Sequence, residues 1–147
     1  MIMSKSDLQN ILTRYPSAIS YRPLKGELDP PIFVNVSVQY KIAAERSAEP
    51  SSTANEIKTV LGNTGVCIFL PGTKFDAQGV RYGRGGGWYD RFLSQTPAEW
   101  LRVGCCSQEQ FSETPLKKEV WDELVDWVCV KKTNTIEYHE TRARFRE

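Results

Sequence analysis

Residues 66–72 read Val-Cys-Ile-Phe-Leu-Pro-Gly, and they form the centre of the fold that the sequence predicts. An unbroken apolar run of this length is typical of a strand in the middle of a parallel sheet, because helices cover both of its faces. Pro71 and Gly72 end the strand, since proline lacks a backbone donor and glycine favours a turn. The remaining elements are therefore expected to be arranged around residues 66–70.

Strand and helix patterns alternate along the chain. The predicted strands are residues 18–21, 32–40, 66–70, 101–106 and 124–130. Capping boxes formed by Ser6 with Gln9 and by Thr53 with Glu56 each predict the start of a helix, and a third helix is expected at about residues 87–94. This alternation predicts a single α/β domain of three layers, in which a mostly parallel sheet carries helices on both faces.

Composition limits the classes of function. The chain has 147 residues, a formal charge of +1 and 40% hydrophobic residues, which suits one soluble globular domain. A charge this close to zero does not favour nucleic acid as a partner. We find neither an apolar run long enough to span a membrane nor the apolar core of a secretory signal, so we expect a cytoplasmic monomer with no membrane partner.

The four cysteines lie in apolar, strand-like stretches, and none forms a Cys-x-x-Cys pair. Free, buried thiols are therefore expected, rather than a zinc site.

The chain is expected to divide near residue 134. Residues 1–134 are predicted to form the α/β domain, and residues 135–147 a polar, basic C-terminal tail that carries Arg142, Arg144 and Arg146. A basic end is ordinarily solvated. The alternative is contact with nucleic acid, which predicts an affinity that falls steeply with salt.

A glycine-rich segment follows the central strand. Residues 76–93 read Asp-Ala-Gln-Gly-Val-Arg-Tyr-Gly-Arg-Gly-Gly-Gly-Trp-Tyr-Asp-Arg-Phe-Leu. Glycine backbones can approach an anion closely, the N-terminus of the following helix adds free N–H groups, and the guanidinium groups of Arg81 and Arg84 match phosphate oxygens. The segment predicts a site for a phosphate-bearing ligand such as a nucleotide.

A plain connecting loop remains the alternative for this segment. It is not a Walker A loop, because no Lys-Ser/Thr follows the glycines, and Trp88 stands where a dinucleotide fingerprint would have its third glycine. Asp90 either binds a metal shared with the phosphates or only favours the helix dipole. Trp88 and Tyr89 either pack in the core with Phe92 and Leu93 or stack on a ligand ring.

The same segment resembles the signature of 5-formyltetrahydrofolate cyclo-ligases, also called methenyltetrahydrofolate synthetases. The residues that carry the resemblance are Pro71, Gly72, Phe75, Asp76, Gly79, Arg81, Gly83, Gly85, Gly86, Gly87, Tyr89, Asp90, Arg91 and Leu93. A second block that resembles the family consists of Val103, Gly104, Gln110, Pro115, Asp122 and Asp126. A weaker similarity lies at Tyr21 and at residues 26–29. The resemblance is good from about residue 66 to residue 130 and poor before it.

The resemblance implies an ATP- and Mg²⁺-dependent ligase of one-carbon folate metabolism. Such enzymes convert 5-formyltetrahydrofolate to 5,10-methenyltetrahydrofolate. Phosphorylation turns the formyl oxygen into a good leaving group, and N10 of the folate then closes the ring. The protein mainly has to position the two substrates and stabilise phosphoryl charge.

The resemblance also implies roles for individual residues. The residues expected to bind the nucleotide are Arg81, Tyr82, Gly83, Arg84, Gly85, Gly86, Gly87, Trp88 and Tyr89. The residues expected to bind the reduced folate are Glu27, Arg84, Gly85, Gly86, Gly87 and Trp88. Among these, Arg84, Gly86 and Tyr89 are expected to act in catalysis. Asp90 and Asp122 are expected to bind Mg²⁺, which prefers oxygen ligands.

The N-terminal half departs from the family pattern. Family members carry a lysine and an arginine on their first helix as Lys-x-x-x-Arg, whereas this chain offers Lys5 and Arg14 at a different spacing. A histidine that usually precedes the second carboxylate is Trp121 here. We therefore expect a shortened or divergent member, and a relative that binds nucleotide or folate without catalysis is the alternative.

Overall fold

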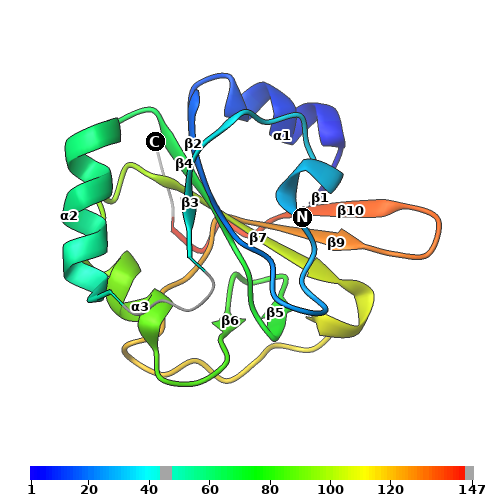
Figure 1. The fold of residues 1–147 in the computed structure, drawn as a ribbon. Helices are drawn as coiled ribbons and strands as arrows, with labels where there is room; N and C mark the ends of the chain where they lie inside the picture. The colour runs from blue at the N-terminus through cyan, green and yellow to red at the C-terminus, as the bar shows by residue number, and fades with distance from the viewer. Residues whose placement is uncertain (44–47, 145–147) are drawn as a thin grey trace.

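A computed structural model describes residues 1–43 and 48–144, and it has a seven-stranded sheet at its centre with the order β1-β10-β9-β7-β4-β2-β3 (Figure 1). The strands are β1 (Ile2–Met3), β2 (Ser17–Tyr21), β3 (Val38–Ile42), β4 (Val66–Leu70), β5 (Lys74–Asp76), β6 (Arg81–Tyr82), β7 (Leu101–Ser107), β8 (Phe111–Ser112), β9 (Trp127–Lys131) and β10 (Ile136–Glu140). The helices are α1 (Lys5–Leu12), α2 (Pro50–Leu61) and α3 (Trp88–Leu93), with 3₁₀ turns η1 (Pro30–Ile32) and η2 (Gln108–Gln110).

The predicted central strand is confirmed. β4 lies between β2 and β7, runs parallel to both, and has every residue buried. β3 pairs parallel with β2, and β9 pairs parallel with β7. Within the large sheet, β10 and β1, at one edge, run antiparallel to their neighbours. Strands β6, β5 and β8 form a separate small sheet.

Helices cover both faces of the large sheet, as predicted (Figure 1). Side chains from α2 and α3 pack with Ile68 and Leu70 in one core cluster. Side chains from α1 pack with Cys67 and Phe69 in a second cluster on the other face. The alternation of β4 residues between the two clusters follows from the period-two geometry of a strand. The fold is therefore a three-layer α/β domain.

Two predicted helix starts are displaced. α1 begins at the N-cap Ser4, whose capping box is completed by Asp7, and not at Ser6. α2 begins at Pro50, several residues before the predicted capping box of Thr53 with Glu56. Proline is favoured in the first turn of a helix, because its missing N–H has no partner there and its φ is already helical.

The strand predicted at residues 32–40 is largely wrong. Residues 30–32 form the 3₁₀ turn η1, and the strand β3 begins only at Val38. Two consecutive prolines, Pro30 and Pro31, set this turn, since neither can donate to a ladder. The apolar pattern is nevertheless used, because Phe33 and Val34 are buried against the α1 face of the sheet.

The predicted polar tail is also partly wrong. Residues 136–140 form β10, in which Tyr138 and His139 are buried. Arg144 donates to the buried carboxylate of Asp126 through Nε at 3.1 Å and Nη2 at 3.0 Å. At least one basic residue of this segment, Arg144, therefore forms an internal ion pair and is not simply solvated. Residues 145–147, including Arg146, lie outside the described part of the chain.

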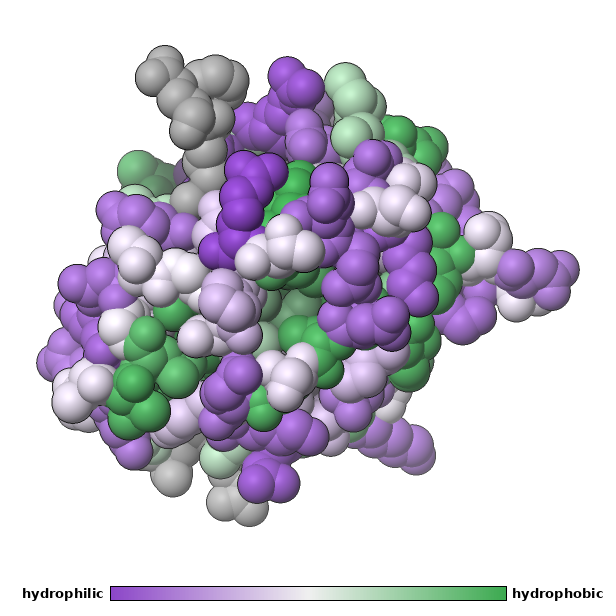
Figure 2. All heavy atoms as spheres, turned by 90° about the horizontal axis from the view of Figure 1, so that it is seen from above, coloured by the Kyte–Doolittle hydropathy of each residue, from purple (hydrophilic) through white to green (hydrophobic). Residues whose placement is uncertain are grey.

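The sequence also led us to expect free, buried cysteines and no membrane-spanning segment. All four cysteines are free and buried, as expected. No helix in the described part of the chain combines the length and apolar character that crossing a membrane requires. The face seen in Figure 2 is mostly hydrophilic, with hydrophobic residues in small groups between the polar ones.

Candidate functional site

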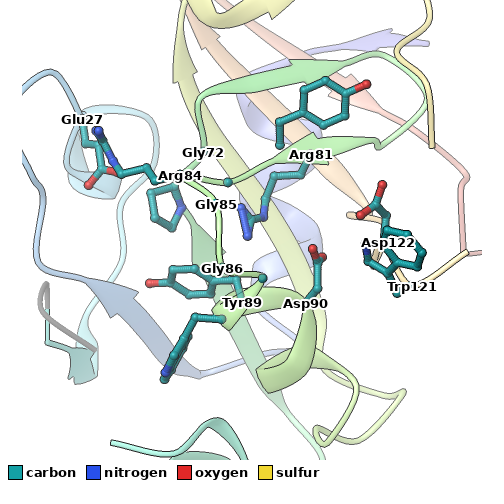
Figure 3. Close-up of a pocket in the computed structure, with 15 residues that line it drawn as sticks. Glu27, Gly72, Arg81, Arg84, Gly85, Gly86, Tyr89, Asp90, Trp121 and Asp122 are labelled. Atoms are coloured by element: carbon teal, nitrogen blue, oxygen red, sulfur yellow. The ribbon is translucent and has the colours of Figure 1, made fainter. Parts of the chain in front are cut away.

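A cavity of about 300 Å³ lies beyond the carboxyl ends of β2 and β4 (Figure 3). The segment after β2 contributes Glu27, and the turn after β4 contributes Pro71 and Gly72. β3 pairs with one side of β2 and β4 with the other, so the strand order reverses at this point. In open α/β sheets, ligands bind at such a switch point.

The glycine-rich segment is fastened to the end of β4. The Thr73 amide donates to the Tyr82 carbonyl at 2.7 Å, and Thr73 Oγ1 donates to the Gly83 carbonyl at 3.1 Å. A Cβ on Gly72 would lie 2.8 Å from the Tyr82 oxygen, so only glycine permits this approach. The turn after β4 thereby fixes where the glycine loop begins.

Three consecutive glycines have left-handed backbones. Their φ angles are +94° at Gly85, +76° at Gly86 and +66° at Gly87. A Cβ on Gly85 or Gly86 would meet nothing within 4 Å, so the conformation, and not packing, requires glycine there. Within the described residues, no acceptor partners the amides of Gly85 and Gly86. These exposed donors suit an anion.

The helix that follows contributes less than the sequence suggested. α3 spans six residues, and its N-cap Gly87 provides no side-chain cap. Because a macrodipole grows with aligned peptide units, so short a helix adds little charge at its N-terminus. The loop amides and the arginines are therefore the main groups of the cavity that could bind an anion.

The two arginines differ in burial. Arg81 is 3% exposed, and its guanidinium carbon lies 5.1 Å from the ring centroid of Tyr89. A Cβ on Gly83 would lie 3.1 Å from Arg81 Nη1, so this glycine leaves room for the guanidinium group. Arg84 has a side chain that is 45% exposed. One fixed and one accessible cation thus lie beside the glycine loop.

Glu27 reaches the cavity from the opposite side. Its side chain is 3% exposed, and Oε1 accepts a hydrogen bond from the Leu24 amide at 2.7 Å. The buried Tyr21 hydroxyl donates to the Leu28 carbonyl and folds the segment back onto the sheet. Arg84 Nε lies 3.3 Å from the second carboxylate oxygen of Glu27. Two residues predicted to bind ligand therefore bind one another here.

Asp90 and Asp122 line the same cavity. Asp90 Oδ1 accepts from the Glu123 amide at 3.0 Å, and Asp122 Oδ2 accepts from the Glu119 amide at 2.8 Å. Burial raises the pKa of the Asp90 carboxyl, although the Glu123 hydrogen bond and the positive charge of Arg81 oppose the shift. Each carboxylate retains a second oxygen for a ligand.

This pair of carboxylates fits magnesium. Mg²⁺ is usually held by one or two carboxylates together with phosphate oxygens and water. Among residues 1–43 and 48–144 there is no group of three or more His, Cys, Asp or Glu side chains that could hold a metal alone. The site fits an ion brought in with a phosphate ligand.

Trp88 packs against the protein more than the sequence suggested. Its ring stacks on Phe92 with centroids 5.2 Å apart, and its Nε1 donates to the Ala48 carbonyl at 3.0 Å. Trp121, which we did not predict as a site residue, also lines the cavity and is 65% exposed. Its position beside Asp122 was the available signal in the sequence.

The structure brings every predicted site residue to one cavity. These residues are Glu27, Arg81, Tyr82, Gly83, Arg84, Gly85, Gly86, Gly87, Trp88, Tyr89, Asp90 and Asp122. Neither Lys5 nor Arg14 is among the described residues that line the cavity. The roles assigned to the cavity residues stay predictions.

Comparisons with known proteins point to one family. Residues 22–131 match the sequence model of the 5-formyltetrahydrofolate cyclo-ligase family. A 5-formyltetrahydrofolate cyclo-ligase of Mycoplasma genitalium is 34% identical over 62 residues, which are 42% of this chain and 36% of that protein. The aligned segment thus spans about a third of the length of this curated relative.

Two solved structures have a similar fold. The 5,10-methenyltetrahydrofolate synthetase of Mycoplasma pneumoniae superposes with a TM-score of 0.55 at 22% identity, over 84% of this chain and 80% of its own. The 5,10-methenyltetrahydrofolate synthetase of Aquifex aeolicus superposes with a TM-score of 0.54 at 22% identity, over 97% of this chain and 81% of its own. At this identity the likeness establishes the fold.

Proposed function

The chain belongs to the 5-formyltetrahydrofolate cyclo-ligase family, and on that premise we propose that it converts 5-formyltetrahydrofolate to 5,10-methenyltetrahydrofolate with ATP and Mg²⁺. One observation carries the proposal: a single cavity gathers a glycine loop, two arginines, two carboxylates on one side and Glu27 on the other. Phosphoryl transfer to an organic acceptor needs this combination of cationic, metal-binding and acceptor-binding groups in one place.

The glycine loop and arginines bind the nucleotide phosphates in this proposal. The amides of Gly85 and Gly86 donate to phosphate oxygens without a side chain in the way. Arg81, held against Tyr89, presents a preset guanidinium fork, and Arg84 adds a second one from the exposed side of the loop. Preset donors stabilise the charge of the transferring phosphoryl group with little reorganisation.

Asp90 and Asp122 hold Mg²⁺ through the carboxylate oxygens that the protein leaves available. The ion, when bound, neutralises negative charge on the phosphates. The backbone amides of Glu119 and Glu123 fix the orientation of these two side chains. Their place on one wall of the cavity directs the polyphosphate toward the glycine loop.

Glu27 binds the reduced folate at the other side of the cavity. Its carboxylate is held by the Leu24 amide and can accept hydrogen bonds from the amino and ring N–H groups of the pterin. The folate formyl oxygen then attacks the γ-phosphorus of ATP, and the bond to the ADP oxygen breaks. N10 attacks the formyl carbon and loses its proton, the phosphorylated oxygen departs as phosphate and carries that proton away, and the methenyl bridge is complete. Arg84, Gly86 and Tyr89 lie where these groups meet.

A non-catalytic nucleotide- or folate-binding role is the second candidate. It is favoured by the position of Lys5 and Arg14, which lie outside the described lining of the cavity, whereas the family's first helix supplies a lysine and an arginine to the phosphates. This candidate predicts thermal stabilisation by ligands without turnover.

The two candidates are separated by one assay on the purified protein. Incubation with 5-formyltetrahydrofolate, ATP and Mg²⁺ is followed by the absorbance of the methenyl product, with ATP or Mg²⁺ left out in control reactions. Product that depends on both supports the cyclo-ligase. Binding of both ligands without product supports the second candidate, and failure to bind either contradicts both.

Arg84→Ala tests whether the Arg84 side chain contributes to product formation. Arg142→Ala is its control, because Arg142 is similarly exposed and ion-paired, with Glu140 at 3.0 Å, but does not line the cavity. We expect product formation to fall at least about 10-fold in the first variant and to stay unchanged in the second. Equal activity in the two variants would remove Arg84 from the proposed site.

A further inference from the structure

The cavity has two chemically different ends. Figure 3 shows Glu27 at one end and Asp122 with Trp121 at the other, while Arg81, the glycine loop and Asp90 lie between them. Phosphate-binding groups therefore occupy the middle. A ligand whose phosphates lie in the middle has its remaining part at one of the two ends.

Trp121, at the same end of the cavity as Asp122, is unusually exposed for a tryptophan. It is 65% exposed, and its neighbour Val120 is 89% exposed. Within residues 1–43 and 48–144, the indole of Trp121 makes no hydrogen bond and no ring contact. An indole left in water forgoes the hydrophobic free energy that burial of its surface would supply. A flat ligand ring recovers part of it.

The other tryptophans pack against the protein or are buried in it. Trp88 already stacks on Phe92 and donates to Ala48, while Trp100 is 0% and Trp127 2% exposed. Of the two tryptophans that line the cavity, Trp121 is thus the one with its ring surface available.

We propose that Trp121 stacks on the base of the bound nucleotide. The inference rests on the proposed function, because it takes the phosphates to lie along the glycine loop and Asp90. Glu27, at the far end, is an acceptor suited to the N–H groups of the pterin. The nucleotide base then lies at the opposite end, on Trp121, so the two substrates meet over the glycine loop.

Stacking on Trp121 also sets the nucleotide specificity. A π-face binds any flat base, and the contact strengthens with ring area rather than with the pattern of donors and acceptors. The inference therefore predicts that ADP and GDP bind similarly and that both bind more tightly than UDP.

The test compares ligands with and without a base. ADP and inorganic tripolyphosphate, each with Mg²⁺, and 5-formyltetrahydrofolate are titrated separately into the wild-type protein, Trp121→Ala, Trp121→Phe and Val120→Ala by calorimetry. Val120→Ala is the matched control, because Val120 is exposed beside Trp121 but does not line the cavity. Thermal unfolding of each variant without ligand verifies that the fold is retained.

The expected result is selective. Trp121→Ala weakens ADP binding roughly 5- to 150-fold, leaves tripolyphosphate binding within about twofold, and Trp121→Phe restores most of the loss. Val120→Ala binds ADP like the wild type. Quenching of tryptophan fluorescence by ADP is reduced in Trp121→Phe but retained in Val120→Ala.

Four outcomes overturn the inference. ADP affinity that does not respond to Trp121→Ala removes the stacking contact while leaving the proposed function intact. If Trp121→Ala weakens the binding of ADP and of tripolyphosphate equally, Trp121 supports the shape of the phosphate site. If the variant weakens only the binding of 5-formyltetrahydrofolate, Trp121 contacts the folate. A wild-type protein that binds neither ADP nor tripolyphosphate contradicts the proposed function as well, which distinguishes the two failures.

Discussion

Asp90 combines a cost in stability with the metal-binding role that we propose for it. Burial raises the pKa of its carboxyl above the ordinary value, and the nearby charges of Asp122 and Glu123 add to the shift. Since the folded-state pKa is the higher one, Asp90 stabilises the fold below its unfolded pKa. This contribution is lost as pH rises through the folded pKa. In the proposed function, burial of this carboxyl is a cost in stability that accompanies its use as a metal ligand.

We predict that Asp90→Asn separates these two effects. Asparagine keeps an oxygen for the Glu123 amide and removes the buried charge, so the unfolding free energy at pH 7 should be equal or higher, by at most about 1 kcal/mol. Mg²⁺-dependent binding of ADP should weaken at least about 10-fold. Urea unfolding at pH 5 and pH 7, with titration of ADP with and without Mg²⁺, measures both.

Glu113→Gln is the control for this prediction, since Glu113 is an exposed acid that does not line the cavity. It should leave stability and ADP binding unchanged. An Asp90→Asn variant that retained the full magnesium dependence of the wild type would show that the metal assignment is wrong.

Gly86 tests the left-handed loop. At φ +76°, valine is strained even though a Cβ there meets no atom of the protein within 4 Å. We predict that Gly86→Val lowers the unfolding free energy by about 1–3 kcal/mol and weakens ADP binding at least about 10-fold, because the side chain stands where phosphates approach. Calorimetry and urea unfolding measure the two changes.

Gly86→Asn is the matched control, because asparagine tolerates the left-handed region. It should restore most of the stability and not the full affinity. Equal affinity for ADP in the valine variant and the wild type would contradict the loop's assignment to phosphates.

At the scale of elements, the small sheet and the large sheet meet at a close contact between β5 and β7. A Cβ on Gly104 of β7 would overlap the ring of Phe75 on β5. The Phe75 side chain is 0% exposed, so it has no space into which to move. This contact places β5, and with it the glycine loop after β6, over the end of the large sheet.

We predict that Gly104→Ala lowers the unfolding free energy by about 1–3 kcal/mol through overpacking. Phe75→Leu alone should also destabilise, through lost packing. The double variant should lose less unfolding free energy than the sum of the two single-variant losses, because the smaller leucine side chain makes room for the alanine methyl group. Strictly additive losses in urea unfolding would argue against this contact.

The elements that the sequence predicted correctly are those with one dominant signal. Residues 66–70 are buried on both faces, so their apolar run is unbroken. Residues 101–106 are also buried, and Arg102, the one charged residue among them, pairs with Glu123. Residues 32–40 show an apolar alternation, yet two prolines before them impose a turn that the alternation does not encode. Residues 136–140 read Ile-Glu-Tyr-His-Glu, and their polar side chains conceal a strand that pairs with β9, just before it in the chain, and with β1, at the distant N-terminal end.

The residues of the candidate site also differ in how well the sequence alone predicted them. The glycines and arginines were predictable from physical chemistry, because they are consecutive and carry one kind of chemistry. Glu27 and Asp122 were reached only through family resemblance, since each lies alone in a polar segment and the cavity is what unites them with the loop. Trp121 had no signal of its own, because exposure cannot be read from one aromatic residue in a loop.

At the scale of the whole molecule, the segment after β10 closes the structure. Thr141 Oγ1 donates to the Val125 carbonyl at 2.7 Å, and Arg144 Nη2 donates to the Trp100 carbonyl at 2.8 Å. The ion pair of Arg144 with Asp126 is 3.0 Å long, with side chains 19% and 8% exposed. Asp126 also accepts the Arg102 amide at 2.8 Å, so one carboxylate joins this segment to β7.

We predict that Arg144→Ala lowers the unfolding free energy by about 2–4 kcal/mol, because it leaves the buried Asp126 charge without its guanidinium partner. Arg142→Ala should change it by less than about 0.5 kcal/mol, since the Arg142 side chain is 63% exposed. Urea unfolding compares the two. Losses of equal size would assign Arg144 to a solvated tail after all.

The pairing of Ile2 with His139 and of Met3 with Tyr138 has a consequence for biosynthesis. During translation β1 leaves the ribosome long before its partner β10 is made, so β1 stays unpaired while the intervening residues are synthesised. The nascent chain can assemble β2, β3, β4 and β7 in order, but its β1 edge closes only after residue 140 has emerged. Chaperones that shield unpaired strands would therefore act on β1 until β10 has emerged.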